Sequence, residues 1–340
     1  MPISIIVGAQ YGSEGKGKVA HAWASRYGAS VTVRVGGPNS GHTAVHDGQT
    51  HVFRQLPTAV LWPGIVAVLP PGSYIDASLL LREIESLGLG PDRLVVDPRA
   101  VVVTAADVDA EREAQLARRI GSTGSGTGSA VARRIRRDGS TVRAADVEEL
   151  RPYLGDTLPL LHATISERGR VLIEGTQGYG LSLLHGLEGD FATSRDTTAA
   201  GFLSETGLSP RDVDQVVLVA RSFPIRVAGN SGSLAFERSW EDIGAKTGRK
   251  ELIERTTVTN RIRRVGDFEP EVVRRAIYAN SPSHIILNHL DYVSDVQTDR
   301  GRAEAAGFVQ RIEEALQSRI DYLGLDAARI VSREEFHAVI

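Results

Sequence analysis

Short runs of apolar, mostly β-branched residues recur along the chain, separated by polar, glycine-rich segments. Several runs are almost continuously apolar, which is typical of strands covered on both faces of a parallel sheet. Between some of them, apolar positions recur at helical spacing. This alternation predicts an α/β fold in which helices cover both faces of a mostly parallel central sheet. The predicted strands cover residues 3–9, 30–37, 64–72, 93–103, 170–178, 215–227 and 284–291, and the clearest helices cover 18–28, 78–88 and 107–120.

A Gly/Ser-rich segment at residues 121–130 has the composition of a flexible linker. Helical patterns flank it closely, however, so a loop inside one domain explains it equally well. The sequence contains no repeat, coiled-coil heptad or block of like charges. We therefore predict a single α/β domain over residues 1–340.

Composition excludes several classes of protein. The formal charge of -3 argues against a nucleic-acid partner, because such a surface normally needs a basic face. The absence of cysteine excludes disulfides, thiolate catalysis and cysteine-based zinc sites. No apolar run approaches the roughly 20 residues of a membrane helix, and the apolar start is too short for a signal-peptide core. We expect a cytoplasmic protein with no membrane partner.

The first predicted strand runs into the glycine-rich segment VGAQYGSEGKGK, residues 7–18. It holds Lys16 and Lys18, two of only four lysines among the 39 Lys and Arg residues. A strand, a glycine turn, a lysine and a helix together bind phosphate through exposed amides and the helix N-terminus. The standard P-loop pattern almost fits, but Val19 stands where Ser or Thr would hold magnesium. We predict an uncommon nucleoside-phosphate loop; the alternative is a tight turn with solvated lysines.

The second predicted strand ends in VRVGGPNSGHT, residues 33–43, another glycine-rich turn with a polar tip. Asn39, His42 and Thr43 offer hydrogen-bond donors and acceptors at the strand edge where α/β proteins gather ligands. A histidine in a loop is usually only solvated, but paired glycines let the imidazole approach a ligand closely. His42 is therefore a candidate acid or electrostatic catalyst.

Together, GAQ-x-G-x-EGKGK and VR-x-GG-x-N-x-GHT resemble the adenylosuccinate synthetase family. Members of this family join aspartate to C6 of a purine nucleotide and use a nucleoside triphosphate to phosphorylate O6 first. The resemblance implies a mostly parallel sheet related to that of P-loop NTPases, a Mg²⁺ cofactor and a homodimer. It covers most of the chain, because weaker matches follow in the family's order.

The resemblance also implies roles for individual residues. Ser13, His42 and Gln177 take the catalytic positions, and Ser13 and the Gly41 carbonyl take the metal positions. The residues implied for the triphosphate are Gly12, Ser13, Glu14, Gly15, Lys16, Gly17, Lys18, Gly41, His42, Thr43, Arg263, Asn288, His289 and Asp291. Those implied for the purine monophosphate are Ser13, Lys16, Asn39, Ser40, Thr123, Arg133, Gln177, Thr193 and Arg261, and those for aspartate are Thr257, Val258, Thr259, Asn260, Arg261 and Arg263.

Arg133 matches a family arginine that reaches into the partner subunit's site, which would make each site composite. Arg261 and Arg263 offer the planar fork that suits a carboxylate. Asp291 is placed to accept from the N–H groups of a guanine base.

Three departures from the family pattern matter. Residue 13 is Ser, where the family carries the aspartate that removes the N1 proton of inosinate and helps to hold magnesium. The C-terminal residues 328–340 lack the STGPDR-like segment that completes the guanine pocket. With His289 beside Asp291, that pocket is incomplete, so we expect ATP or dATP as the favoured donor and GTP as the alternative. The chain is also short, like the archaeal and phage members.

A serine hydroxyl cannot act as a general base near pH 7. The short side chain of Ser13 leaves room beside N1 and C2, where guanine carries an amino group that hypoxanthine lacks. Its oxygen can accept from that group without a buried charge. The pattern resembles the phage branch that acts on guanylate, usually dGMP, and yields N6-succino-2-amino-deoxyadenylate for 2-aminoadenine DNA, in the host cytoplasm. The acceptor of the N1 proton is then unassigned.

Other functions stay open from the sequence. GMP could replace dGMP, and an ordinary adenylosuccinate synthetase would use inosinate and GTP. A third alternative is a nucleotide-binding switch protein without catalysis. The segment 257–263 argues against the switch, because a switch needs no site for an amino-acid carboxylate.

Overall fold

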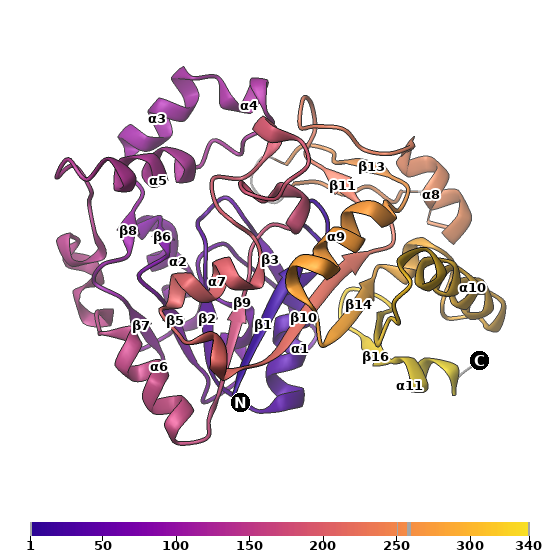
Figure 1. The fold of residues 1–340 in the computed structure, drawn as a ribbon, viewed down its shortest axis with the longest axis horizontal. Coiled ribbons are helices and arrows are strands. Elements are labelled where there is room, and N and C mark those ends of the chain that lie inside the picture. Colours follow the sequence, from indigo (N-terminus) through magenta and orange to yellow (C-terminus); the bar gives the residue numbers. More distant parts are fainter. Residues whose placement is uncertain (1, 250, 257–259, 339–340) are drawn as a thin grey trace.

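The computed structural model describes residues 2–249, 251–256 and 260–338, and its centre is a nine-stranded sheet (Figure 1). Neighbouring strands are parallel except for the antiparallel pair at one edge. This confirms the predicted mostly parallel sheet. In spatial order the strands are β16 (Ile330–Ser332), β15 (Tyr322–Gly324), β14 (His284–Asn288), β10 (Val213–Arg221), β1 (Ile3–Gly8), β9 (Arg170–Glu174), β2 (Ala29–Arg34), β5 (Val66–Leu69) and β7 (Leu94–Val96).

Three small sheets accompany the main one. They are the hairpin of β3 (His42–His46) and β4 (Gln49–Phe53), the parallel pair of β6 (Tyr74–Ile75) and β8 (Val101–Val102), and the antiparallel sheet of β11 (Ile225–Arg226), β13 (Arg264–Gly266) and β12 (Glu237–Arg238).

Helices fill most of the connections between the strands. They are α1 (Lys16–Tyr27), α2 (Ala77–Leu87), α3 (Ala105–Glu113), α4 (Leu116–Arg119), α5 (Thr127–Arg136), α6 (Thr157–Ser166), α7 (Ala199–Thr206), α8 (Trp240–Thr247), α9 (Pro270–Asn280), α10 (Asp299–Leu316) and α11 (Arg333–His337). Their ends follow ordinary capping chemistry: the Asp76 side chain accepts from the Leu79 amide to begin α2, and Gly88 ends it with φ 60°. Among the described residues, no helix has the length and hydropathy needed to cross a membrane.

Three predicted elements are divided in the structure. The helix expected over 107–120 is split into α3 and α4, because Gln115 adopts a left-handed backbone conformation with φ 53°. A turn closed by Ala100 N–H donating to the Asp97 carbonyl separates β7 from β8 within the strand expected over 93–103. The strand expected over 215–227 is divided into β10 and β11, and Pro224 lies between them. The segment 121–130 is a loop that continues into α5.

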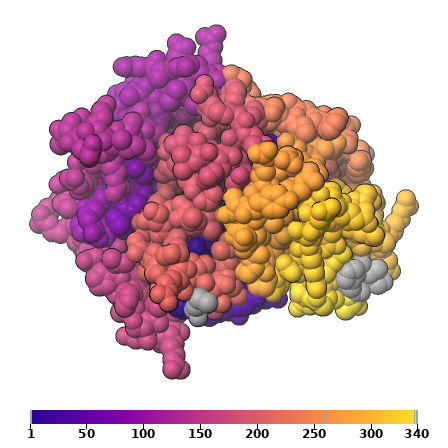
Figure 2. Space-filling model, viewed as in Figure 1, coloured from indigo at the N-terminus to yellow at the C-terminus, as the bar shows by residue number. Residues whose placement is uncertain are grey.

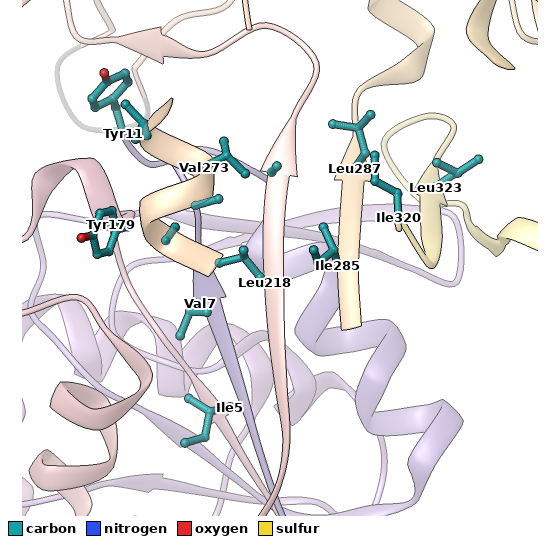
Figure 3. Packing of buried hydrophobic residues seen from close by; sticks show 14 of the residues in the cluster. Ile5, Val7, Tyr11, Tyr179, Leu218, Val273, Ile285, Leu287, Ile320 and Leu323 are labelled. Carbon is teal, nitrogen blue, oxygen red and sulfur yellow. The ribbon is translucent and has the colours of Figure 1, made fainter. Parts of the chain in front are cut away.

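The two faces of the central strand β1 are covered by different helices. Ile5 and Val7 point to the face where Val273 of α9 packs (Figure 3). Ile6 points to the opposite face and belongs to the cluster that contains Trp23 of α1. Each large aliphatic side chain buried in this way contributes about 1.5–3 kcal/mol. Figure 2 shows that later segments cover almost all of the first strand in this view.

The carboxyl ends of five adjacent strands, β14, β10, β1, β9 and β2, meet at one edge of the sheet. The loops that follow them are therefore neighbours in space although they come from distant parts of the sequence. Helices α3 to α5 and the sheet of β11, β13 and β12 flank this edge (Figure 1).

Candidate active site

A cavity of about 560 Å³ lies at this edge of the sheet. The structure brings most of the predicted site residues together in its wall: Gly12, Ser13, Gly15, Lys16, Gly17, Asn39, Ser40, Gly41, His42, Thr43, Thr123, Gln177, Thr193, Arg263 and His289. Glu14, Lys18, Arg133, Asn260, Arg261, Asn288 and Asp291 lie outside this wall. Thr257, Val258 and Thr259 fall outside the described residues.

The first loop between β1 and α1 needs its glycines for two reasons. Gly12 and Gly15 have φ values of 90° and 89°, which favour residues without a side chain. A Cβ on Gly15 would lie 2.7 Å from Nδ2 of Asn288, and one on Gly17 would lie 2.8 Å from Cβ of His42. The glycines therefore let β14 and β3 approach the loop, which places the amides of the loop at the cavity.

Both lysines of the loop are buried and have partners. Lys16 Nζ lies 2.6 Å from Oε2 of Glu14, whose other oxygen accepts from the amides of Gln10 and Gly12. Lys18 Nζ donates to the Asp326 carbonyl at 2.8 Å, and burial lowers the pKa of its ammonium to about 8. The alternative of lysines on a solvated helix start is therefore wrong.

His42 begins β3 and is 6% exposed. Its Nδ1 lies 2.5 Å from Oε1 of Glu174 and also contacts Nη1 of Arg34. Burial, followed by the charge of Arg34, lowers the pKa of His42 to about 3, against the opposing effect of Glu174. His42 is therefore neutral at neutral pH in the ligand-free site, and Nε2 is the nitrogen that remains available to the cavity.

Glu174 is a functional residue that the sequence reasoning missed. It ends β9, is fully buried, and accepts from Arg34 Nη1 and the Thr58 amide, both at 2.8 Å. Burial would raise the pKa of Glu174, but the hydrogen bond with His42 and the charge of Arg34 lower it instead. A glutamate directly after the apolar run of residues 171–173 was the signal that could have revealed it.

Gln177, Thr193 and Thr123, three of the residues predicted for the purine monophosphate, line the same cavity. Gln177 follows β9 with a left-handed φ of 53°. The Thr193 amide donates to the Leu181 carbonyl at 2.7 Å, and the Thr123 hydroxyl donates to Ser125 Oγ at 3.2 Å. These hydroxyl and amide groups can surround a nucleotide with neutral hydrogen-bond partners.

A second glutamate that the sequence reasoning missed holds the loop before α5. Glu111 of α3 lines the cavity and accepts from the amides of Gly126 at 3.0 Å and Gly128 at 2.8 Å. Its carboxylate thereby occupies amides at the N-terminus of α5, where an anion is stabilised.

The Arg133 side chain is buried against α3, where Nη2 donates to Asp107 Oδ2 at 2.7 Å. It also donates to the carbonyls of Val102 at 2.8 Å and Ser140 at 2.9 Å. Arg133 therefore holds α5 against α3 in this structure, and its role in a partner's site stays a prediction.

The two arginines predicted to bind aspartate differ in position. Arg263 lines the cavity, and its Nη1 donates to Glu254 Oε2 at 3.0 Å. Arg261 is exposed and lies outside the cavity wall, next to Asn260, which has a left-handed φ of 51°. The described residues therefore place one of the two guanidinium groups at the site.

Comparison with known proteins agrees with this geometry. The family model "Adenylosuccinate synthetase" matches residues 5–147 and 143–300. The adenylosuccinate synthetase of Methanococcus vannielii is 36% identical over 336 residues, which cover 94% of this chain and 95% of the relative. This chain belongs to the adenylosuccinate synthetase family. It is accordingly a carbon–nitrogen ligase that joins aspartate to a purine nucleotide.

Solved structures of this family resemble the present synthetase over their whole length. The succinoaminodeoxyadenylate synthetase of cyanophage S-2L, bound to dGMP and dATP, has a TM-score of 0.82 and 29% identity, covering 99% of both chains. The fully ligated adenylosuccinate synthetase of Plasmodium falciparum has a TM-score of 0.81 at 20% identity, covers 98% of this chain and 100% of its own, and supports the fold alone.

In this synthetase, the side chain predicted to read a guanine donor already has a partner. Oδ2 of Asp291 accepts from Arg249 Nη1 at 2.7 Å. Oδ1 of Asp291 is buried and has no hydrogen-bond partner among the described residues, as is also true of Nε2 of His289. Burial raises the pKa of the Asp291 carboxyl, against the opposing effect of Arg249.

Adenylosuccinate synthetases depend on Mg²⁺, and the oxygen atoms at this cavity fit that ion. The Ser13 side chain is exposed to the cavity that Gly41 also lines, so a hydroxyl and a carbonyl are available. The described residues contain no cluster of three or more acidic or histidine side chains that could hold a metal ion.

Proposed function

We propose that this synthetase joins L-aspartate to C6 of a guanylate, with dGMP as the preferred substrate and GMP as the ribonucleotide alternative. A nucleoside triphosphate is converted to the diphosphate and phosphate, and the product is N6-succino-2-amino-deoxyadenylate, a precursor for 2-aminoadenine DNA. The observation that carries this proposal is Ser13, a neutral side chain exposed in the cavity wall where the family carries a carboxylate. The likeness to the cyanophage S-2L enzyme bound to dGMP supports it.

The size and charge of residue 13 are the physical basis for the choice of purine. A carboxylate at this position would face the 2-amino group of guanine at close range and occupy its space. The Ser13 hydroxyl is shorter, carries no charge and can accept a hydrogen bond from that amino group. An enzyme strongly rejects a purine that leaves a buried hydrogen-bonding group of the site unpaired. It rejects only weakly a purine that merely leaves space in the site unfilled.

The first loop would bind the triphosphate. The Lys16 ammonium and the amides of Gln10 and Gly12 are all occupied by the Glu14 carboxylate in the ligand-free site. Phosphate oxygens carry more charge than a carboxylate and offer more acceptors, so they can replace Glu14 on the loop. Lys18 would contribute a second ammonium once its bond to the Asp326 carbonyl is exchanged.

Ser13 Oγ and the Gly41 carbonyl would hold Mg²⁺ together with oxygens of the phosphates. When bound, Mg²⁺ neutralises the negative charge that develops on the transferred phosphoryl group.

His42 would stabilise the charge that develops at purine O6. Glu174 fixes Nδ1, so Nε2 is the atom that can donate to an oxygen in the cavity. That donation requires a protonated imidazole, and a bound triphosphate supplies the negative charge that raises the pKa of His42. Preorganised donors of this kind lower the barrier because they need no reorganisation during the reaction.

Arg263 would hold a carboxylate of aspartate. The amine of this aspartate attacks C6 of the O6-phosphorylated purine, the C6–O6 bond breaks, and phosphate leaves with O6. The guanidinium lies in the cavity wall, and its fork of donors matches a carboxylate. Arg261 is proposed for the same substrate, and the remaining part of that segment, residues 257–259, lies outside the described residues.

The donor is proposed to be ATP or dATP, with GTP as the alternative. The ion pair between Arg249 and Asp291 occupies one oxygen of the carboxylate that a guanine base would need. The cyanophage S-2L enzyme, which is described as bound to dATP as an energy donor, supports this choice.

A homodimer is proposed from family membership. The loop that contains Leu183, Leu184 and Leu187 exposes 56%, 70% and 46% of these side chains, which is the kind of surface that a partner subunit covers. Sedimentation of the purified protein at several concentrations tests this proposal, and a monomer at micromolar concentration would refute it.

The ordinary reaction with inosinate is the second candidate. It is favoured by the archaeal relatives, such as the adenylosuccinate synthetase of Methanocaldococcus jannaschii, which is 35% identical over 320 residues and is covered to 90%, with 92% of this chain. In that case Ser13 would be tolerated at the position of the family aspartate.

One assay separates the two candidates. Purified protein is incubated with Mg²⁺, dATP and aspartate, together with dGMP, GMP or IMP, and the succino product is identified by mass spectrometry. We expect the dGMP reaction to have the highest kcat/KM. Reactions without aspartate serve as controls, because a ligase releases phosphate only when both substrates are present. A higher kcat/KM for IMP would replace the guanylate proposal with the ordinary one.

A further inference from the structure

Arg221 is a fully buried cation directly behind the first loop. It ends β10, and the Gln10 side chain holds both of its backbone groups: Oε1 accepts from Arg221 N at 2.9 Å and Nε2 donates to Arg221 O at 3.2 Å. Its Nη1 donates to the carbonyl of Ser13 at 2.9 Å. Arg221 therefore fixes the peptide of Ser13, whose φ of 56° is unusual for a residue other than glycine.

One carboxylate balances both Arg221 and the cavity arginine. Glu254 Oε1 accepts from Arg221 Nη2 at 2.5 Å, and its Oε2 accepts from Arg263 Nη1 at 3.0 Å. The Arg263 amide also donates to the Glu254 carbonyl at 2.9 Å. The two oxygens of Glu254 thus form ion pairs with two guanidinium groups. Without this carboxylate, the two positive charges would repel each other in a poorly hydrated environment.

The environment keeps this carboxylate charged. Burial alone would raise the pKa of Glu254, but the charge and hydrogen bond of Arg221 and the charge of Arg263 outweigh burial and lower it. Glu254 lines the same cavity as Ser13 and Arg263, with 15% of its side chain exposed.

We propose that Glu254 is a positioning residue for the ligation, because its carboxylate holds Arg263 at the cavity wall and, through Arg221, holds the peptide of Ser13. This rests on the proposed function in one respect, the binding of the aspartate carboxylate by Arg263. The two ends of the reaction, the phosphate loop and the carboxylate-binding arginine, are then aligned by one side chain.

Removing the negative charge of Glu254 should make the site attract a small anion, which a loss of packing alone would not do. In Glu254→Gln, two guanidinium groups face each other beside the cavity with only an amide between them. Among the described residues, Glu254 is the hydrogen-bonded side-chain acceptor of Arg263, so this guanidinium loses its carboxylate partner in the variant. A small anion from solution is drawn to such a pair.

The first measurement is binding of inorganic phosphate to the ligand-free protein by calorimetry. We expect Glu254→Gln to bind phosphate at least about tenfold more tightly than the wild type, because the Arg263 guanidinium at the cavity wall is released from its carboxylate partner. Glu251→Gln is the matched control, because Glu251 is an exposed glutamate of the same segment. Unchanged phosphate affinity in a folded Glu254→Gln protein would overturn the proposal.

The second measurement separates positioning from folding. We expect Glu254→Gln to raise the KM for aspartate and the KM for the triphosphate together, since both arginines lose their anchor. Glu254→Asp retains the charge but withdraws it by one methylene, so it should raise both KM values less and should not bind extra phosphate. If Glu254→Gln does not fold, Glu254→Asp decides: unchanged KM values for both substrates would overturn the proposal.

These results do not depend on which purine is used. If IMP proves to be the substrate, the guanylate proposal fails while the phosphate measurement still tests Glu254. If Glu254→Gln changes neither phosphate binding nor the two KM values, the role of Glu254 fails while the choice of purine is unaffected.

Discussion

Glu174 Oε1 lies 2.5 Å from Nδ1 of His42, although 132 residues separate the two in the chain. The carboxylate can only accept, so Nδ1 of the imidazole carries the proton in this contact. The relationship fixes the ring and directs Nε2 to the cavity. The contact thereby holds the His42 imidazole in a fixed orientation where phosphoryl transfer is proposed.

His42→Asn should lower kcat by about 100-fold, the usual loss when one donor to a developing negative charge is removed. The KM for the triphosphate should change little, because His42 is proposed to act in the transition state. Steady-state kinetics with dGMP, aspartate and dATP provide the measurement. His162→Asn, which changes an exposed histidine of α6, is the control. An unchanged kcat for His42→Asn would remove His42 from the mechanism.

Ser13→Asp should shift the enzyme toward IMP. The left-handed backbone at residue 13 tolerates Asp, so the variant should fold. The new carboxylate supplies a base and a magnesium ligand but crowds the 2-amino group of guanine. We expect the ratio of kcat/KM for IMP to that for dGMP to rise about tenfold or more, the effect of one mismatched hydrogen-bonding partner. An unaltered ratio, measured with both nucleotides on both proteins, would separate residue 13 from the choice of purine.

Arg249→Ala should improve the use of GTP. Removing the guanidinium leaves Asp291 free to accept from a guanine base, whereas an adenine donor gains nothing from it. We expect kcat/KM for GTP to rise about tenfold relative to dATP, equivalent to one charge-assisted hydrogen bond. Lys246→Ala removes an exposed cation of the neighbouring helix α8 and should leave the ratio unaltered. A wild-type enzyme that already strongly prefers GTP would contradict this explanation.

Arg133→Ala should destabilise the fold. The substitution leaves Asp107 as a buried carboxylate without its partner, which costs about 3 kcal/mol or more in the free energy of unfolding. Arg136→Ala on the same helix removes an exposed ion pair, with 63% and 45% of the two side chains accessible, and should cost less than about 1 kcal/mol. Urea unfolding of the three proteins provides the comparison.

The same variant tests the shared site that family resemblance implied. Arg133→Ala mixed with Lys16→Ala would restore activity in hybrid dimers if Arg133 served the partner's site. If the Arg133→Ala protein is as stable as the wild type but binds the purine monophosphate poorly, the result supports a role of Arg133 in the partner's site.

The sequence by itself determined the sheet, the two glycine-rich loops and the family. Continuous β-branched runs are strands wherever they are covered on both faces, as β1 and β10 show. Glycines at fixed spacing encode a loop such as residues 9–15 locally, because they permit backbone conformations that other residues avoid. Those signals need no knowledge of the distant chain.

Only the tertiary structure decided which charges face each other. Glu174 meets His42 across 132 residues and Glu254 meets Arg221 across 33, so both pairings join segments that only the fold brings together. The ion pair of Arg133 with Asp107, 26 residues away, is likewise visible only in the structure. Whether two charged side chains pair depends on the distance between them and on their burial. The local pattern of residues determines neither.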